Sequence, residues 1–122
     1  MKLSASAAFA IYGALSLKDK TPLGFLSVIS KLGSDSASAM LAVRDTYRHL
    51  EISGKHECAE AAHQIYGGAP YLPFRSSEVT RRIRYFAAQN YMDDRTVYRR
   101  LTEVRKIYAR MLSHYEELTA KK

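Results

Sequence analysis

The stretch DDRTVYRRLTEVRKIYARMLSHYEEL, residues 93–118, decides the fold class. Its apolar residues recur at alternating steps of four and three, which is the spacing of one face of an α-helix and of a heptad seam over about three heptads. Carboxylates at Asp93 and Asp94 suit the positive end of a helix, so a long helix is predicted to begin there. The seam residues are Val97, Leu101, Val104, Tyr108, Met111, Tyr115 and Leu118.

A second helix is predicted directly before this one, in RSSEVTRRIRYFAAQN, residues 75–90. A serine supplies the N-cap of this helix. The spacing of its apolar residues predicts one apolar face, with Arg81 and Arg84 on the opposite side. The apolar face consists of Val79, Ile83, Phe86 and Ala87.

These two helices and the turn NYM between them have the parts of a helix-turn-helix. Phe86 and Ala87 supply the apolar and the small residue of the first helix, Asp93 caps the second, and apolar anchors follow. Tyr91 stands where glycine is usual in the turn. Tyrosine tolerates a positive φ poorly, so a looser turn is expected.

The face of the long helix opposite the seam is polar and basic, at about 100° per residue. In a helix-turn-helix, the first turns of the second helix reach base edges and phosphates. A helical hairpin or a coiled-coil arm that forms a homodimer is the alternative for the same pattern. The residues expected on this face are Arg95, Tyr98, Arg99, Thr102 and Lys106.

The rest of the chain predicts helices and no strands. One helix is expected over residues 4–17, and a second from the Thr21 cap and Pro22 to a stop at Gly33. A third begins at Ser34 or Asp35, with Met40, Val43, Tyr47 and Leu50 on one face, and stops at Gly54; a fourth covers HECAEAAHQIYGG, residues 56–68.

The fold class expected is therefore all-α: a compact multi-helix domain with a C-terminal helix-turn-helix and a long last helix. GGAPYLPF, residues 67–74, has two glycines and two prolines and is the one stretch that looks like a boundary. We expect a single helical domain over residues 1–122. It would consist of an N-terminal body (1–66), this loop, and a basic C-terminal part (75–122).

Charge is concentrated in the last part of the chain. The chain has 122 residues and a net charge of +7. Residues 1–73 hold seven basic residues (Lys or Arg) and six acidic residues (Asp or Glu). Residues 74–122 hold twelve basic and six acidic residues. A basic part on a nearly neutral body is typical of proteins that bind a polyanion, since each neutralised phosphate releases counterions. The alternative is that the charge serves only solubility.

Other chemistry has little support in the sequence. The single cysteine, Cys58, excludes a disulfide framework and every CxxC zinc site, and favours a reducing, cytoplasmic setting. His56, Cys58 and His63 have irregular spacing for metal ligands, so no metal or other cofactor is expected. No phosphate-binding loop or nucleophile motif occurs, which argues against an enzyme. No apolar run reaches the roughly 18 residues that span a membrane, and the first segment is interpreted as a helix and not a signal peptide.

Two parts of the chain resemble the Q-type late-gene antitermination proteins of lambdoid phages. KTPLGFLSVISKLG, residues 20–33, is similar to a segment near the amino end of that family. LPFRSSEVTRRIRYF (72–86) and the long stretch from residue 93 are similar to its carboxyl part. Longer members carry cysteine pairs in a zinc-bearing insert, which this chain lacks.

The resemblance implies a protein that binds a DNA element beside a late promoter, loads onto a paused RNA polymerase and makes it ignore terminators. By the same resemblance, Arg81, Arg82 and Arg84 would contact the DNA backbone, and Arg95, Tyr98 and Arg99 would enter the groove. The expected function is thus a DNA-binding transcription regulator, most specifically an antitermination factor in the cytoplasm of a bacterial host. The alternatives are a conventional helix-turn-helix repressor and a small helical interaction protein that inhibits a host complex.

Overall fold

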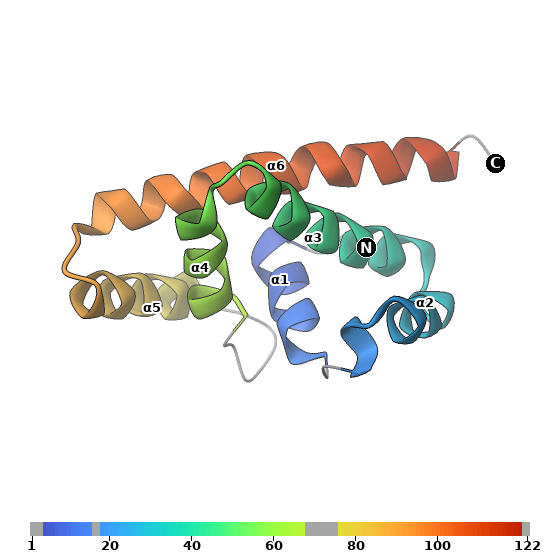
Figure 1. Ribbon diagram of the computed structural model, residues 1–122, viewed down its shortest axis with the longest axis horizontal. Helices are drawn as coiled ribbons and strands as arrows, with labels where there is room; N and C mark the ends of the chain where they lie inside the picture. Colours follow the sequence, from blue (N-terminus) through green and yellow to red (C-terminus); the bar gives the residue numbers. More distant parts are fainter. Residues whose placement is uncertain (1–3, 16–17, 68–75, 121–122) are drawn as a thin grey trace.

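The computed structural model describes residues 4–15, 18–67 and 76–120. These residues form six α-helices and one short 3-10 helix, and no strand occurs among them (Figure 1). The all-α prediction is confirmed. The helices are α1 (Ala5–Ala14), α2 (Pro22–Ser30), α3 (Ser34–Ile52), α4 (His56–Ile65), α5 (Ser76–Gln89) and α6 (Asp94–Ala120), and the 3-10 helix is η1 (Lys18–Lys20).

Hydroxyl caps start the first two α-helices, as the sequence predicts. The Ser4 hydroxyl accepts from the Ala7 amide, and the Thr21 hydroxyl accepts from the Gly24 amide, both at 3.2 Å. Each bond satisfies one of the amides that a helix start leaves without a partner. Helix α1 ends at Ala14, earlier than expected, and residues 16–17 of the predicted helix lie outside the described part of the chain.

Gly33 plays a different part from the one predicted. Helix α2 ends at Ser30 with Lys31 as its C-cap, and Gly33, at φ −66°, is the N-cap of α3. The predicted stop at Gly33 was therefore wrong by about one turn, because glycine serves at an N-cap as well as after a helix end. Gly54 does close α3 as predicted: it adopts φ +75°, where glycine carries no steric penalty.

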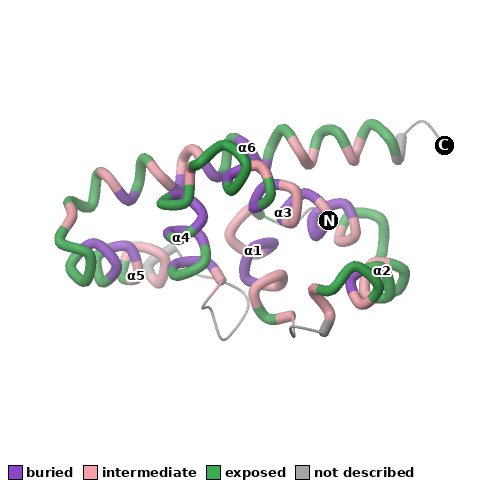
Figure 2. Tube along the Cα trace, viewed as in Figure 1, coloured by how far each residue is buried: buried purple, intermediate pink, exposed green. Residues whose placement is uncertain are grey.

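Helix α6 lies along one side of the molecule and packs against α3, α4 and α5 (Figure 1). Helix α1 packs against α3 and α4. One continuous apolar core takes residues from all six α-helices, and Figure 2 shows the buried positions on the inward sides of the helices. At its centre the Phe9 ring lies 5.4 to 5.7 Å from the rings of Tyr47, Tyr66 and Tyr108.

A close approach of two backbones holds α1 against the end of α4. A Cβ atom on Gly13 would lie 2.6 Å from the Cα atom of Gly67. No side chain fits there, so the contact requires glycine. Most of the predicted loop 67–74 lies outside the described residues. None of the described helices is both long and apolar enough to cross a membrane.

Candidate nucleic-acid interface

Helix α5 buries the face that its sequence predicts. Ile83, Phe86 and Ala87 are buried against α4 and α6, and Val79 is partly buried. Arg81 and Arg84 are exposed on the other side. The basic side chains of α5 therefore face away from the core, with one exception.

Arg82 is the exception. Its side chain is only 17% exposed, and it donates to the Ile65 carbonyl oxygen at 3.2 Å and to the Glu78 carboxylate at 3.1 Å. Arg81 also donates to Glu78, at 2.5 Å, and these hydrogen bonds hold the pKa of the Glu78 carboxyl below its ordinary value. The structure thus places Arg82 between α5 and α4, apart from the exposed arginines with which the sequence groups it.

The turn between α5 and α6 is a regular Schellman motif. The Met92 amide donates to the Ala87 carbonyl at 2.9 Å, and the Tyr91 amide donates to the Ala88 carbonyl at 3.4 Å. Tyr91 adopts the left-handed conformation, with φ 53°, that the motif needs. The expectation of a looser turn was wrong, because tyrosine adopts the glycine conformation here and the 97% exposed ring meets no obstacle.

Helix α6 starts and packs as predicted. The Asp93 carboxylate accepts from the Arg95 amide at 2.8 Å, and α6 begins at Asp94. The first four seam residues are buried within the chain's own core, Met111 and Tyr115 are partly buried, and Leu118 is 49% exposed. Ile107, which is not part of the predicted seam, is also buried. A dimerisation arm that presents the whole seam to a partner is therefore not what α6 forms.

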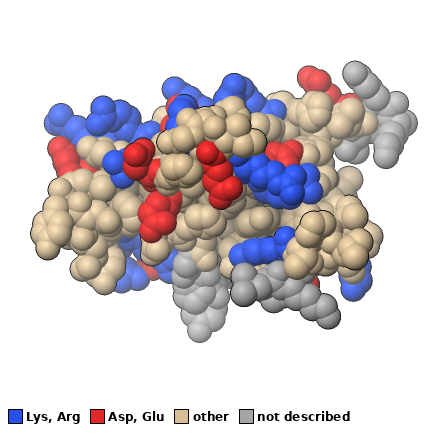
Figure 3. Space-filling view, in the orientation of Figure 1, with Lys and Arg blue, Asp and Glu red and all other residues tan. Residues whose placement is uncertain are grey.

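The outward face of α6 carries most of the predicted groove residues. Arg95, Tyr98, Arg99 and Lys106 are exposed and Thr102 is partly exposed. Arg105 and Arg110, which the predicted set does not include, are exposed on the same helix. Arg105 follows Thr102 by three residues and Arg110 follows Lys106 by four, and this helical spacing is the signal in the sequence that points to them. Figure 3 shows Lys and Arg side chains along the upper edge of the molecule, over α6.

Acidic side chains oppose the positive charge of this face only in part: the Glu103 carboxylate interacts with Lys106 and Arg110 at longer range. Within the described residues no ion pair involves Arg95, Arg99, Arg105, Lys106 or Arg110. Glu103, the one acid in the middle of α6, is bound by Lys55 at 2.6 Å, which holds the pKa of its carboxyl below the ordinary value. The outward face of α6 therefore keeps its positive charge available to an external anion.

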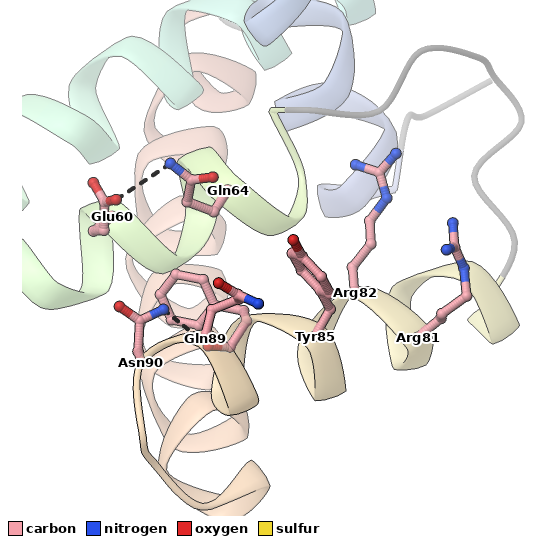
Figure 4. Close-up of a pocket in the computed structure, with 8 residues that line it drawn as sticks. Glu60, Gln64, Arg81, Arg82, Tyr85, Gln89 and Asn90 are labelled. Atoms are coloured by element: carbon pink, nitrogen blue, oxygen red, sulfur yellow. Dashed lines mark hydrogen bonds between the residues drawn. The ribbon is translucent and has the colours of Figure 1, made fainter.

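A groove of about 610 Å³ between α4 and α5 has a different character (Figure 4). Gln64, Tyr85, Gln89 and Asn90 line it with polar and aromatic groups, and the arginines at its edge are already held by Glu78. Asn90 donates its side-chain amide to the Phe86 carbonyl at 2.8 Å. Glu60 also lines the groove and accepts from the Gln64 side chain at 3.3 Å, so this surface carries charges of both signs, unlike the face of α6.

The histidine and cysteine residues do not form a metal site in the part of the chain that the structure describes. Cys58 is buried, and burial raises the pKa of its thiol. The His63 ring stacks on Tyr47 with centroids 4.1 Å apart, so it has a packing role.

No family model, curated protein or solved structure matches this chain. The resemblance to the Q-type antitermination proteins therefore stays a prediction.

Proposed function

We propose that this chain binds duplex DNA through the outward face of α6 and acts as a regulator of transcription. The observation that carries the proposal is the pairing of two helices joined by a closed Schellman turn with a long basic face that has no ion-pair partner among the described residues. In such units the second helix enters the major groove and the turn fixes its angle to the first.

The roles of the side chains follow from their positions. Arg95, Tyr98 and Arg99 stand on the first turns of α6, where base edges are within reach, and guanidinium groups pair with guanine in the major groove. Lys106 stands two to three turns further along, at the distance of the flanking backbone, and Thr102 lies between the two groups. Arg84 is the exposed α5 residue best suited to a phosphate.

Salt dependence tests the proposal most directly. Five exposed cations on α6 would release counterions on binding, which predicts a slope of log K against log salt of about −4 to −5. Fluorescence anisotropy with a labelled duplex at several salt concentrations measures it. The variant Arg95→Gln/Arg99→Gln should lower the slope by about two, whereas Arg48→Gln, an exposed arginine on α3, should leave it unchanged. No duplex binding at moderate salt would refute the proposal.

The more specific proposal, antitermination through RNA polymerase, rests on the resemblance described above. Co-elution of the chain with purified bacterial RNA polymerase, followed by a read-through assay on a template with a terminator, tests it. Binding to duplex DNA without polymerase co-elution would favour a conventional repressor instead.

The interaction-protein alternative has one observation in its favour. Leu23 and Leu26 on α2 are 83% and 60% exposed, and exposed leucines of this kind occur where proteins meet. It predicts that Leu23→Ser/Leu26→Ser abolishes the activity of the chain while duplex binding is absent in the wild type.

A further inference from the structure

A second pocket lies beside the basic face of α6, and the chemistry of its walls is that of an oxyanion site. It has a volume of about 530 Å³ and lies where the start of α1, the end of α4, α5 and α6 meet. Side chains from all four helices reach it. Those with polar groups are Ser4, Ser6, Tyr66, Thr80, Tyr98 and Arg105.

Hydroxyl groups and one guanidinium make up the polar part of this lining. The described residues of the wall include no carboxylate, so nothing there competes with an anion for Arg105. Hydroxyls and guanidinium groups are the side chains that contact phosphate oxygens most often in complexes with DNA. A neutral or cationic ligand would leave the guanidinium without a counter-charge.

Arg105 is held in place before any ligand arrives. It donates to the Thr102 hydroxyl at 3.2 Å, and it lies close enough to the buried Tyr66 hydroxyl to oppose the rise that burial causes in the pKa of that phenol. Both partners are uncharged, so they orient the guanidinium without neutralising it. An arginine oriented in this way loses less conformational entropy on binding than a free surface side chain.

The position of the pocket along α6 suits a backbone phosphate of a duplex. Arg105 follows Arg99 by six residues, or about 9 Å along the helix axis. The major groove is about 12 Å wide, so a helix that reads bases with its first turns brings later residues to the strand at the edge of the groove. Tyr98, on the same side of α6, lies both on the outward face and at the wall of the pocket.

We propose that this pocket binds a phosphate of the DNA backbone, with Arg105 as its charged ligand and the hydroxyls of Ser6, Thr80 and Tyr98 around it. The amino-terminal helix α1 thereby becomes part of the DNA-binding surface. The proposal rests on the proposed function for the source of the phosphate, whereas the affinity of the pocket for an oxyanion is independent of it.

The first experiment uses inorganic phosphate alone. Addition of phosphate to the ¹⁵N-labelled full chain should shift the amide signals of Ser6, Thr80 and Arg105, and matched ionic strength of chloride should not. The shifts should disappear in Arg105→Gln and persist in Arg110→Gln, which removes an equal charge from the same helix outside the pocket. Equal shifts with phosphate and chloride, or shifts that survive Arg105→Gln, would overturn the site.

The second experiment uses a duplex. Arg105→Gln should lower the affinity roughly tenfold on specific and random sequences alike and reduce the salt slope by about one. Ser6→Ala/Thr80→Val and Arg105→Lys keep the charge, so they should lower the affinity severalfold with no change in slope. Arg110→Gln is the matched control, with a smaller loss of affinity.

The outcomes separate the two proposals. If the chain binds no duplex but phosphate shifts the pocket signals, the DNA function fails and the oxyanion site stands. If the chain binds duplex and the pocket variants lose no more affinity than Arg110→Gln, the DNA function stands and the phosphate-binding role of the pocket fails.

Discussion

Truncation of Leu101 to alanine tests whether α6 belongs to the core of its own chain. The Leu101 side chain is 1% exposed and lies in the central apolar cluster with Val97 and Val104. The change removes three carbon atoms, each worth about 0.8 kcal/mol of burial, and leaves a cavity. Together these terms predict a loss of about 3 kcal/mol in the free energy of unfolding, within the range of about 2–5 kcal/mol for buried leucines.

Urea denaturation followed by circular dichroism measures this loss. For a chain of this length a loss of that size lowers the melting temperature by about 12 °C. Leu118→Ala is the matched control, because it makes the same substitution on the same helix at a residue that is 49% exposed. It should cost less than about 0.5 kcal/mol.

Protein concentration decides between the two roles of the helix. If Leu101 packs within its own chain, the denaturation midpoints of wild type and variant stay the same over a hundredfold range of protein concentration. A wild-type midpoint that rises with concentration, together with a wild-type dimer that becomes a folded monomer in Leu101→Ala on sedimentation, would refute the intrachain packing argued above.

Three further predictions concern single positions. Tyr91→Gly should raise the free energy of unfolding by about 1 kcal/mol, since it removes a side chain from a left-handed residue, whereas Tyr91→Ala should not. Gly13→Ala should lower the free energy of unfolding by about 1–3 kcal/mol, because the new Cβ atom meets the Gly67 backbone. Gly33→Ser is the control: no atom lies near the new Cβ at this N-cap, so the free energy of unfolding should stay the same or rise in the same denaturation experiment. Glu103→Gln should cost at most about 0.5 kcal/mol at pH 7. The cost should shrink as the pH falls through the depressed pKa of the folded carboxyl, since the stabilisation is full above the unfolded pKa and is lost below the folded one; a cost that grows toward low pH would contradict this assignment.

Periodicity and caps were enough to predict most of the fold. The hydroxyl caps at Ser4 and Thr21, the apolar face of α3 and the start of α6 depend on neighbours within one or two helical turns, so the sequence contains their causes. The end of α2 was mispredicted because Gly33 fits two roles, and only the entry angle of α3 selects between them.

The candidate site was less predictable because it depends on long-range contacts. The sequence treats Arg81, Arg82 and Arg84 as equivalent, but the carbonyl of Ile65, 17 residues earlier, takes Arg82 into the groove between α4 and α5. Arg105 gains its distinct role from Tyr66, which approaches it from another helix. Ile107 lies outside the heptad pattern and is nevertheless buried. The reason is that both α3 and α4 pack against α6, so the buried face of α6 is wider than a single heptad seam.

The length of α6 couples two distant parts of the molecule. It runs unbroken for 27 residues, or about 40 Å, and its later turns rest on α3, where Tyr115 donates to the Asp45 carboxylate. The segment that presents Arg95 and Arg99 and the segment that rests on α3 are therefore parts of one continuous helix, and Val97 and Leu101 anchor its basic end in the core. The packing of α6 against α3 and α4 thus sets the direction in which Arg95 and Arg99 project from the molecule.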